Sequence, residues 1–509
     1  MLETVKTYDF IIVGSGIGGL VSANILAMEG YSVLVLEKNH QIGGNLQVFS
    51  RDQCIFDTGV HYIGGLDKGQ NLHQIFKYLG IIDELNIHRL DDHGFDRIIF
   101  SDGREYKHAH GYECFIKSLL VDFPDELEAI NNFCDKVKEI CDYFPLYNLR
   151  NKNEGKSYIT HPEILSINAW DYVSSITSDK RLRSVLLGNS LLYAGDRRTT
   201  PFYIVALILN SYLSGSYRMI NGGSQIAREL TKKIHNLGGE ILKHQHVCKA
   251  NYSKGKIVSV ETKTGEIFHG KTFISNIHPK LTVNIFGENK FRPAYVNRLN
   301  KNKNTISTFM LHLSFKDFSF EYLNHNVYVH KIDNVLDAVE YNKNIWPESL
   351  YISTSVSKNQ GKWAESMSVM TYMNYDEFKK WGNSFNTVAE FGERGAEYED
   401  FKKNKEQIVI NEVEKMFPRI RDSIKGIYSS TPLTYRDYIG TDDGSLYGIL
   451  KDSNNIDKSK IHSKTHIPNL FQTGQNIVFH GILGSTISSL VTCFNFIDDK
   501  KLLSKINNA

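Results

Sequence analysis

Residues able to do chemistry are concentrated near the start of the chain, in a glycine-rich turn and an acid that follows it. The turn reads Gly14-Ser15-Gly16-Ile17-Gly18-Gly19; an apolar run over residues 10–13 precedes it, and Glu37 follows the next apolar run, over 33–36. Glycines at this spacing let a backbone approach a pyrophosphate, and the amides at the start of the following helix face its negative charge. The pattern predicts a dinucleotide site between a strand and a helix.

Each residue of this motif has a separate part in the predicted site. Gly14 permits the tight turn, Gly16 leaves room for the pyrophosphate, and Gly19 lets a helix over residues 18–29 pack closely on the strand. The carboxylate of Glu37 accepts hydrogen bonds from ribose hydroxyls and disfavours the phosphorylated ribose of NADP. We therefore expect cofactor contacts from Gly14, Ser15, Gly16, Gly18, Gly19, Glu37 and Lys38.

A second pair of glycines decides which dinucleotide is expected. Gly43-Gly44-Asn45 follows the acid within a few residues. Rossmann units that bind only NAD do not need this pair, whereas in FAD enzymes of the glutathione-reductase type a second glycine loop lies along the pyrophosphate and ribityl chain. FAD is therefore the predicted cofactor. Since no second dinucleotide fingerprint follows, we expect electrons to enter or leave through an external donor or acceptor.

The next segment carries a family resemblance. Phe56-Asp57-Thr58-Gly59-Val60-His61-Tyr62-Ile63-Gly64-Gly65 resembles the phytoene desaturase, carotenoid isomerase and retinol saturase group of flavoproteins, and is closest to its saturase–isomerase branch. Similar segments recur at residues 221–224, 238–241, 275–279, 431–434, 440–448, 469–476 and 480–484. The chain departs from the group's usual sequence at three places. The group often has a proline at Ile220-Asn221, and an acidic residue at the positions of His278 and Gln475.

The resemblance implies an α/β fold with a discontinuous Rossmann FAD-binding domain of the glutathione-reductase type. The positions of the motifs assign residues 1–80, 215–285 and 425–509 to that domain, and 81–214 and 286–424 to an inserted α+β substrate domain with a sheet facing the flavin. It also implies non-covalent FAD contacts from Gly43, Gly44, Asn45, Gly59, Val60, His61, Val247 (against the adenine), Gly474, Gln475, Gly481 and Ile482.

The implied activity is an oxidoreductase acting on carbon–carbon double bonds of an apolar conjugated polyene or isoprenoid-like substrate. A saturase resembling the retinol-reducing members is the main prediction; a desaturase or a cis–trans isomerase is the alternative, and an FAD-dependent amine oxidase a further one. His61, Tyr62 and His480 are the candidate catalytic groups near the flavin. His61 and His480 could instead only hydrogen-bond the cofactor or the backbone, and Tyr193 is expected in the wall of a substrate tunnel.

Composition excludes other classes of function. Lys and Arg number 59 against 57 Asp and Glu, so no electrostatic attraction to nucleic acid is expected. There is no G-x-S-x-G elbow, H-E-x-x-H motif or P-loop, and the pairs His108/His110 and His244/His246 lack further ligands at metal-binding spacing, so no metal is predicted.

Location is predicted from cysteines and apolar runs. The six cysteines include no C-x-x-C pair, which favours a reduced, cytoplasmic compartment. The longest apolar run, residues 202–213, is shorter than the about 20 residues of a membrane-spanning helix. We expect it to be a core helix or a membrane-dipping entrance. Because a polyene is drawn from lipid, peripheral contact with the inner face of the membrane is also expected.

Overall fold

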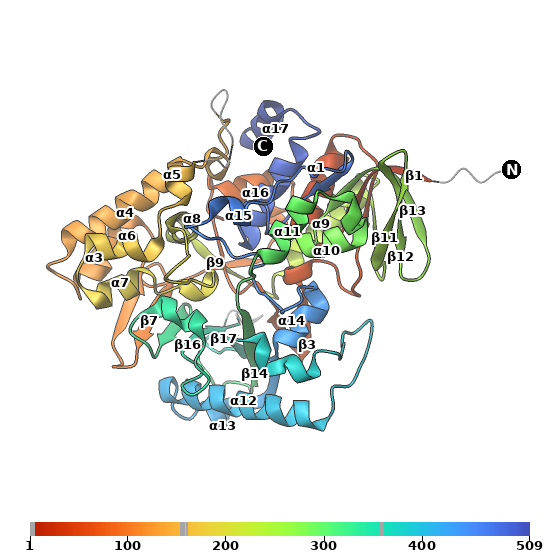
Figure 1. Cartoon of the computed structure of the whole chain (residues 1–509). Helices are drawn as coiled ribbons and strands as arrows, with labels where there is room; N and C mark the ends of the chain where they lie inside the picture. The colour runs from red at the N-terminus through yellow and green to blue at the C-terminus, as the bar shows by residue number, and fades with distance from the viewer. Residues whose placement is uncertain (1–5, 153–157, 159–160, 356–360) are drawn as a thin grey trace.

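The computed structural model describes residues 6–152, 158, 161–355 and 361–509. Its first large sheet has the strand order β10-β2-β1-β13-β12-β11, with β19 beside β13 (Figure 1). Strands β10, β2, β1, β13 and β19 are joined in parallel, as a Rossmann sheet requires. These strands are β1 (Thr7–Val13), β2 (Val33–Leu36), β10 (Glu240–Leu242), β11 (Val247–Ser253), β12 (Lys256–Thr262), β13 (Ile267–Ser275) and β19 (Leu470–Gln472).

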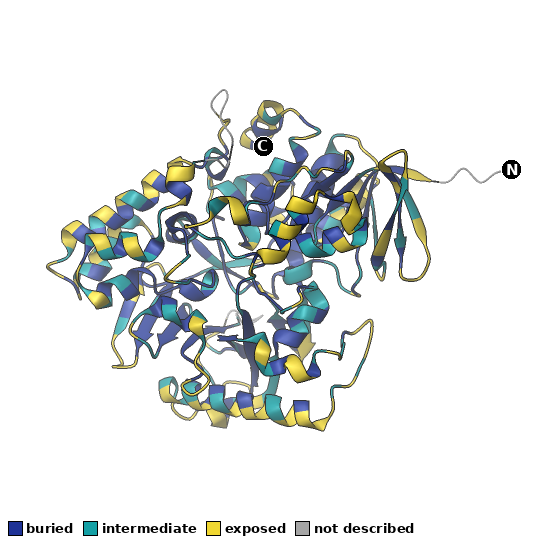
Figure 2. Ribbon diagram, in the orientation of Figure 1, coloured by how far each residue is buried: buried dark blue, intermediate teal, exposed yellow. Residues whose placement is uncertain are grey.

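Three helices bury the apolar residues of this sheet. α1 (Ile17–Met28) is apolar around most of its circumference because it packs against α9 (Ser224–Asn236) and α16 (Gly481–Cys493) as well as the sheet. The predicted strand at 33–36 is confirmed, and the predicted helix at 18–29 begins and ends one residue earlier. Figure 2 shows the resulting buried interior of this layer.

A second large sheet has the order β18-β14-β17-β16-β15-β7-β8 and lies below the first in Figure 1. Its strands are β7 (Asp96–Phe100), β8 (Glu105–His108), β14 (Ser307–Phe315), β15 (Asn326–His330), β16 (Ser349–Thr354), β17 (Ser366–Met373) and β18 (Ile424–Ser430). Every residue of β14 is buried, since α12 (Ala396–Met416) covers the outer face and the first domain approaches the inner one. β18 belongs to this sheet, so the second sheet extends past the predicted boundary at residue 425.

A helical layer lies beside both sheets, at the left of Figure 1. It contains α3 (Tyr112–Leu120), α4 (Leu127–Asp142), α5 (Pro162–Leu165), α6 (Ala169–Ile176), α7 (Lys180–Leu186) and α8 (Phe202–Leu213). α8 is the predicted apolar run; it is almost entirely buried against α4 and α6, as a core helix would be. In the described residues, no helix combines the length and apolar character needed to cross a membrane.

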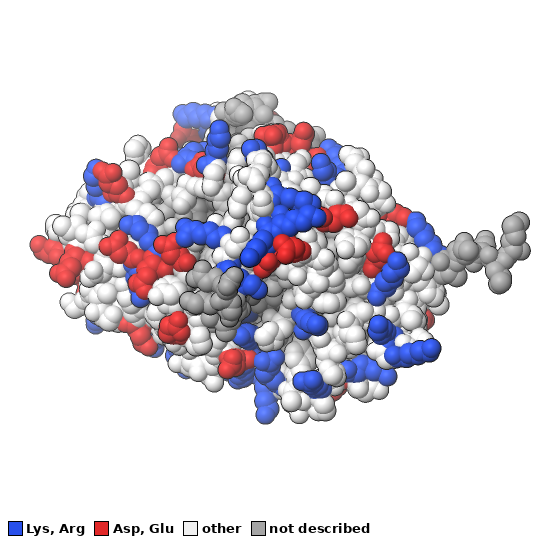
Figure 3. Space-filling model, turned by 90° about the horizontal axis from the view of Figure 1, so that it is seen from above, with Lys and Arg blue, Asp and Glu red and all other residues white. Residues whose placement is uncertain are grey.

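Short elements join these layers and close the structure. A small sheet contains β5 (Ile63–Gly64), β9 (Ser216–Met219) and β6 (Ile87–Arg89), and β3 (Val48–Arg51) pairs with β4 (Cys54–Asp57). The other helices are α2 (Asn71–Tyr78), α10 (Pro279–Phe286), α11 (Pro293–Lys301), α13 (Ile420–Ser423), α14 (Pro432–Ile439), α15 (Ile456–Ser459) and α17 (Asp499–Asn507). Figure 3 shows acidic and basic side chains interspersed over one face, consistent with the balanced charge count.

Candidate active site

A cavity of about 540 Å³ opens where β1 and β2 end, at the carboxyl edge of the Rossmann sheet. It continues from this edge toward β17 of the second sheet, whose Met370 also lines it. Of the residues predicted to contact the cofactor, those that line the cavity are Gly14, Ser15, Gly16, Gly18, Glu37, Lys38, Gly43, Gly44, Asn45, Gly59, Val60, His61, Val247, Gly474, Gln475, Gly481 and Ile482. Gly19 lies behind them, where a Cβ would approach the carbonyl oxygen of Gly14 to 2.2 Å.

The backbone segments that line this part of the cavity lie very close together, because the residues where they meet are glycines. A Cβ on Gly18 would lie 2.8 Å from the Cα of Gly474, and one on Gly44 would lie 3.1 Å from the Cα of Gly16. Three segments far apart in the sequence therefore converge at distances that side chains would prevent. The result is an open cradle of backbone amides, which is the environment that a pyrophosphate needs.

Asn276 holds this cradle together, and the sequence analysis assigned it no role. Its side-chain amide donates hydrogen bonds to the carbonyl oxygens of Gly14 and Gly16, both at 3.2 Å. Asn276 follows β13, which pairs with β1 in parallel, so the two strand ends lie side by side. An amide directly after a strand is the only sequence signal for this contact, and it says nothing about which turn the amide reaches.

Glu37, which the sequence predicts to bind a ribose, is held in place at the cavity wall by hydrogen bonds. It is buried, and its carboxylate accepts hydrogen bonds from the amide of Ser15 at 3.0 Å, the hydroxyl of Ser15 at 2.5 Å and the amide of Asn39 at 2.8 Å. Each carboxylate oxygen has two lone pairs, so acceptor capacity remains for a ligand. Beside it, burial lowers the pKa of Lys38, whose Nζ donates to the carbonyl oxygen of Asp437 at 2.9 Å.

These features fit a flavin dinucleotide. The glycine cradle suits the pyrophosphate, Glu37 suits ribose hydroxyls, and the N-terminus of α16 reaches the cavity through Gly481, Ile482 and Ser485. In the described residues, no group of three or more His, Cys, Asp or Glu side chains is arranged to hold a metal.

His61 lies at the inner end of the cavity, with Met370, Tyr435, Leu446 and Tyr447 also among the lining residues. Its ring stands 5.4 Å from the ring of Tyr351, and no described residue forms a hydrogen bond to it. Burial, together with the positive charge of Arg218, lowers the pKa of His61 to about 4. A neutral imidazole therefore faces a mostly apolar chamber, where it can give or accept one proton.

Two of the predicted catalytic groups have other partners. The hydroxyl of Tyr62 donates to Asp96 at 3.0 Å and lies 2.8 Å from the hydroxyl of Tyr328. His480 Nε2 lies 3.2 Å from the carbonyl oxygen of Leu192, and burial lowers its pKa to about 4. Neither Tyr62 nor His480 is among the described residues that line the cavity, and the structure brings His61 alone of the three to its wall.

Tyr193, expected in a tunnel wall, is also absent from the described residues that line the cavity. Its hydroxyl is buried and has no hydrogen-bond partner among the described residues. The interior around it is filled by tyrosines, and Tyr372 and Tyr447 donate to the carbonyl oxygens of Ser190 and Leu191 at 3.0 and 2.9 Å. Tyr372 and Tyr447 therefore help to hold the turn that contains Tyr193 in place.

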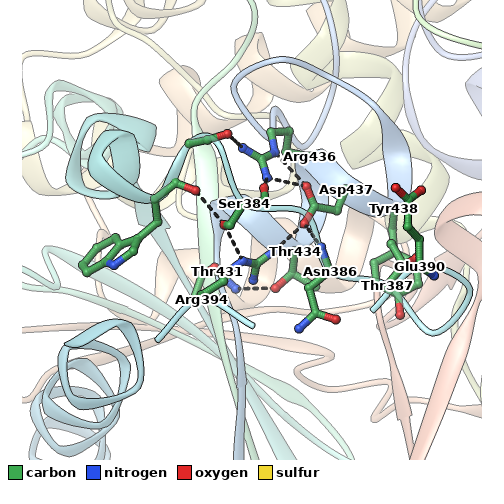
Figure 4. Close-up of polar contacts among 12 residues, drawn as sticks. Ser384, Asn386, Thr387, Glu390, Arg394, Thr431, Thr434, Arg436, Asp437 and Tyr438 are labelled. Atoms are coloured by element: carbon green, nitrogen blue, oxygen red, sulfur yellow. Dashed lines mark hydrogen bonds and ion pairs between the residues drawn. The ribbon is translucent and has the colours of Figure 1, made fainter. Parts of the chain in front are cut away.

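A segment that we call the strap, residues 384–394, lies beside the cavity and α14, and Figure 4 shows its polar contacts with α14. Phe385 of the strap lines the cavity, and the strap is fastened to α14. Asp437 of α14 is fully buried; it accepts a hydrogen bond from the Asn386 amide at 2.9 Å and forms ion pairs with both Arg394 and Arg436. The arrangement can keep a bound ligand from leaving on this side.

Comparison with known proteins places this geometry in a family. The model of the flavin-containing amine oxidoreductase family matches residues 17–323. All-trans-retinol 13,14-reductase of Danio rerio is 25% identical, over 97% of this chain and 86% of that protein. Prolycopene isomerase 1 of an Oncidium hybrid cultivar is 29% identical, over 54% of this chain and 49% of that protein.

The solved structure of cyclohexylamine oxidase from Brevibacterium oxydans IH-35A has a TM-score of 0.60 at 13% identity, covering 99% of both chains. This likeness concerns the fold alone. The predicted fold class, a Rossmann-type flavin domain with an α+β insertion, is confirmed. The chain is a flavin-dependent oxidoreductase and belongs to the flavin-containing amine oxidoreductase family. Its similarity to the saturase–isomerase group, predicted from residues 56–65, is also confirmed.

Proposed function

We propose that this enzyme reduces a carbon–carbon double bond in an apolar conjugated polyene, using non-covalently bound FAD. The observation that carries the proposal is the match along nearly the whole chain to an all-trans-retinol 13,14-reductase. The site agrees with it, because the inner end of the cavity combines apolar and aromatic side chains with a neutral histidine, His61. Bound flavin supplies hydride transfer at N5, so the protein has to supply orientation, exclusion of water and a proton.

The cofactor contacts follow from the cavity wall. The glycine cradle with Asn276 would hold the pyrophosphate, Glu37 the adenosine ribose, and Val247 the adenine. Gly474, Gln475, Gly481 and Ile482 would approach the flavin and its ribityl chain, with the N-terminus of α16 directed at the flavin carbonyl. Precipitation with acid tests the mode of attachment: non-covalent FAD appears entirely in the supernatant, whereas covalent flavin remains with the protein.

The division into domains follows from the same proposal. Residues 1–80, 215–285 and 425–509 would bind FAD, and 81–214 and 286–424 would bind substrate, except that β18 continues the substrate-domain sheet to Ser430. An external donor would reduce the flavin. Peripheral contact with the cytoplasmic face of a membrane would supply the substrate; co-sedimentation with liposomes at low salt tests this, and a fully unbound fraction would contradict it.

The reaction itself is tested without oxygen. Dithionite reduces the bound flavin, all-trans-retinol or a carotenoid is added, and the flavin and polyene absorbance bands are followed together. Flavin reoxidation at the same rate as loss of the polyene band is the expected result. The proposal would be refuted if the reduced enzyme left every retinoid and carotenoid unchanged. Peroxide release with amines would favour an amine oxidase.

A second candidate, a cis–trans isomerase, is favoured by the similarity to prolycopene isomerase 1 over about half of the chain. The same experiment separates the two activities. An isomerase shifts the polyene band while the flavin stays reduced, and the mass of the product is unchanged. A desaturase would instead need oxidised flavin and would remove two hydrogens from its substrate.

A further inference from the structure

A second, smaller cavity of about 50 Å³ lies on the other side of His61. It is enclosed by β4, β9 and the ends of β16 and β17, so it lies between the flavin domain and the second sheet. Its lining is mainly polar and includes Asp57, Arg218, Ser353, Ser366 and Ser368. His61 lines both cavities and therefore forms the partition between them.

Asp57 is held at the wall of this polar cavity by the backbone. Its Oδ1 accepts a hydrogen bond from the amide of Gly223 at 2.6 Å. A Cβ on Gly222 or Gly223 would lie 3.2 or 3.3 Å from that oxygen, so the glycine pair permits the close approach. Burial raises the pKa of Asp57 to about 7. This carboxyl group can therefore hold or release a proton near neutral pH.

Arg218 gives the cavity a hydrogen-bond donor that no described residue satisfies. Its side chain is buried, and its Nη2 donates to the carbonyl oxygen of His325 at 2.6 Å and to Asn326 Oδ1 at 2.9 Å. Its Nε has no partner in the described part of the chain. Buried donors of this kind are satisfied by water, and 50 Å³ holds roughly three to five water molecules at about 10–15 Å³ each.

The outer end of the polar cavity reaches the surface. Among its lining residues, Asn221 is exposed, and Ser355 and Glu365 are partly exposed. Water and protons can enter there and reach His61, which faces the flavin cavity on its other side.

We propose that the polar cavity is a proton-delivery channel, in which ordered water carries protons from solvent through Asp57 to His61, and His61 donates a proton to the substrate. This inference rests on the proposed polyene reduction. One alkene carbon gains a hydride from the reduced flavin, and its neighbour gains the proton from one ring nitrogen of His61. The other ring nitrogen takes a proton from water or Asp57, and solvent restores that proton. The alkene is reduced by two electrons and the flavin is oxidised by two.

The charged and titratable groups around this path define its pH dependence. Arg218 faces His61 from β9, and Glu365 lies at the outer end before β17. His312 of β14 bonds Ser368 through Nδ1 at 3.0 Å, and burial lowers its pKa to about 3, so it remains neutral. Asp57 is thus the group in the cavity wall expected to change charge near pH 7, with the rate falling as pH rises and its proton is lost.

The experiment compares Asp57→Asn and His61→Gln with His108→Gln, a buried histidine of β8 whose ring bonds the Val185 carbonyl oxygen. Single-turnover reoxidation of the prereduced holoenzyme by a polyene is measured from pH 5.5 to 9, in H₂O and D₂O, after the flavin content of each variant is determined. General acid catalysis contributes about 10²–10⁴-fold, so His61→Gln should slow the step by at least about 100-fold. Asp57→Asn should slow it about tenfold and abolish the pH dependence near 7, while His108→Gln behaves as the wild type.

A second readout does not depend on activity. Infrared difference spectra of the holoenzyme between pH 5 and 9 should show protonated carboxyl absorption that disappears with a midpoint near 7. Because burial raises the pKa of Asp96 to about 7 as well, the band of Asp57 is the one that is present in the wild type and missing in Asp57→Asn. Absence of that band in the wild type, or an active enzyme whose rate and pH profile survive both substitutions, would overturn the channel. If the wild type leaves every polyene unchanged, the proposed function fails, and the carboxyl titration still shows whether Asp57 holds a proton near pH 7.

Discussion

The buried ion pairs of Asp437 should determine both the stability of the protein and the retention of flavin. The Asp437 carboxylate is fully buried between two guanidinium groups, Arg394 of the strap and Arg436 of α14. Arg394 also donates to the hydroxyls of Ser384 at 3.1 Å and Tyr398 at 3.2 Å. The informative changes are Asp437→Asn and Arg394→Met, which remove opposite sides of the same contact.

The two variants should lower the free energy of unfolding by different amounts, because they leave different buried charges without a partner. Asp437→Asn leaves two buried guanidinium groups facing no carboxylate, and breaking a buried pair in this way costs about 3–5 kcal/mol. Arg394→Met keeps the Arg436–Asp437 pair and leaves acceptors unpaired, which costs about 1–3 kcal/mol. Either change removes a contact that holds the strap on α14. If the strap is held less firmly by about 1.4 kcal/mol of free energy, and flavin binding depends on it, flavin binding weakens about tenfold.

Urea unfolding of the apoprotein measures the first effect, and the fluorescence of flavin released on dilution measures the second. Arg419→Met is the control, since the Arg419–Asp422 pair lies on the surface and should leave both quantities unchanged. The reasoning would be refuted if Arg394→Met were at least as destabilising as Asp437→Asn, or if both variants unfolded and released flavin as the control does.

Three further changes have distinct outcomes. Gly18→Ala puts a methyl group 2.8 Å from the Cα of Gly474, so the purified protein should lack the flavin absorbance that Gly361→Ala, with open space at its Cβ position and no positive φ, retains. Burial lowers the pKa of Lys451 from 10.5 to about 8. Between these pH values the unfolded chain binds one more proton than the folded protein, so stability should rise with pH across that range. Urea midpoints at pH 7.5 and 9.5 should show a smaller rise in Lys451→Met than in the wild type. Burial lowers the pKa of His108 from 6.5 to about 4, so stability should fall as the pH drops through that range. His108→Gln should reduce the proton uptake on acid unfolding by about one. An unchanged slope of the unfolding free energy against pH would contradict this.

Local patterns in the sequence determined the Rossmann unit and the class of cofactor. The glycine turn at 14–19, the acid at Glu37 and the apolar runs around them act through neighbouring backbone, so their spacing specifies strand, turn and helix without knowledge of the rest of the chain. The longest apolar run, residues 202–213, likewise coincides with α8, because a helix buried on most sides needs apolar residues around its circumference.

Contacts between distant segments were decided only by the tertiary structure. Asn276 reaches the turn at Gly14 across 262 positions because β13 and β1 pair in parallel, and no local signal specifies that pairing. Tyr62 follows His61 in the chain, yet its hydroxyl bonds Asp96 while His61 lines the cavity. Which histidine lines the cavity, and which carboxyl group lies behind it, therefore depend on how the two sheets pack against each other.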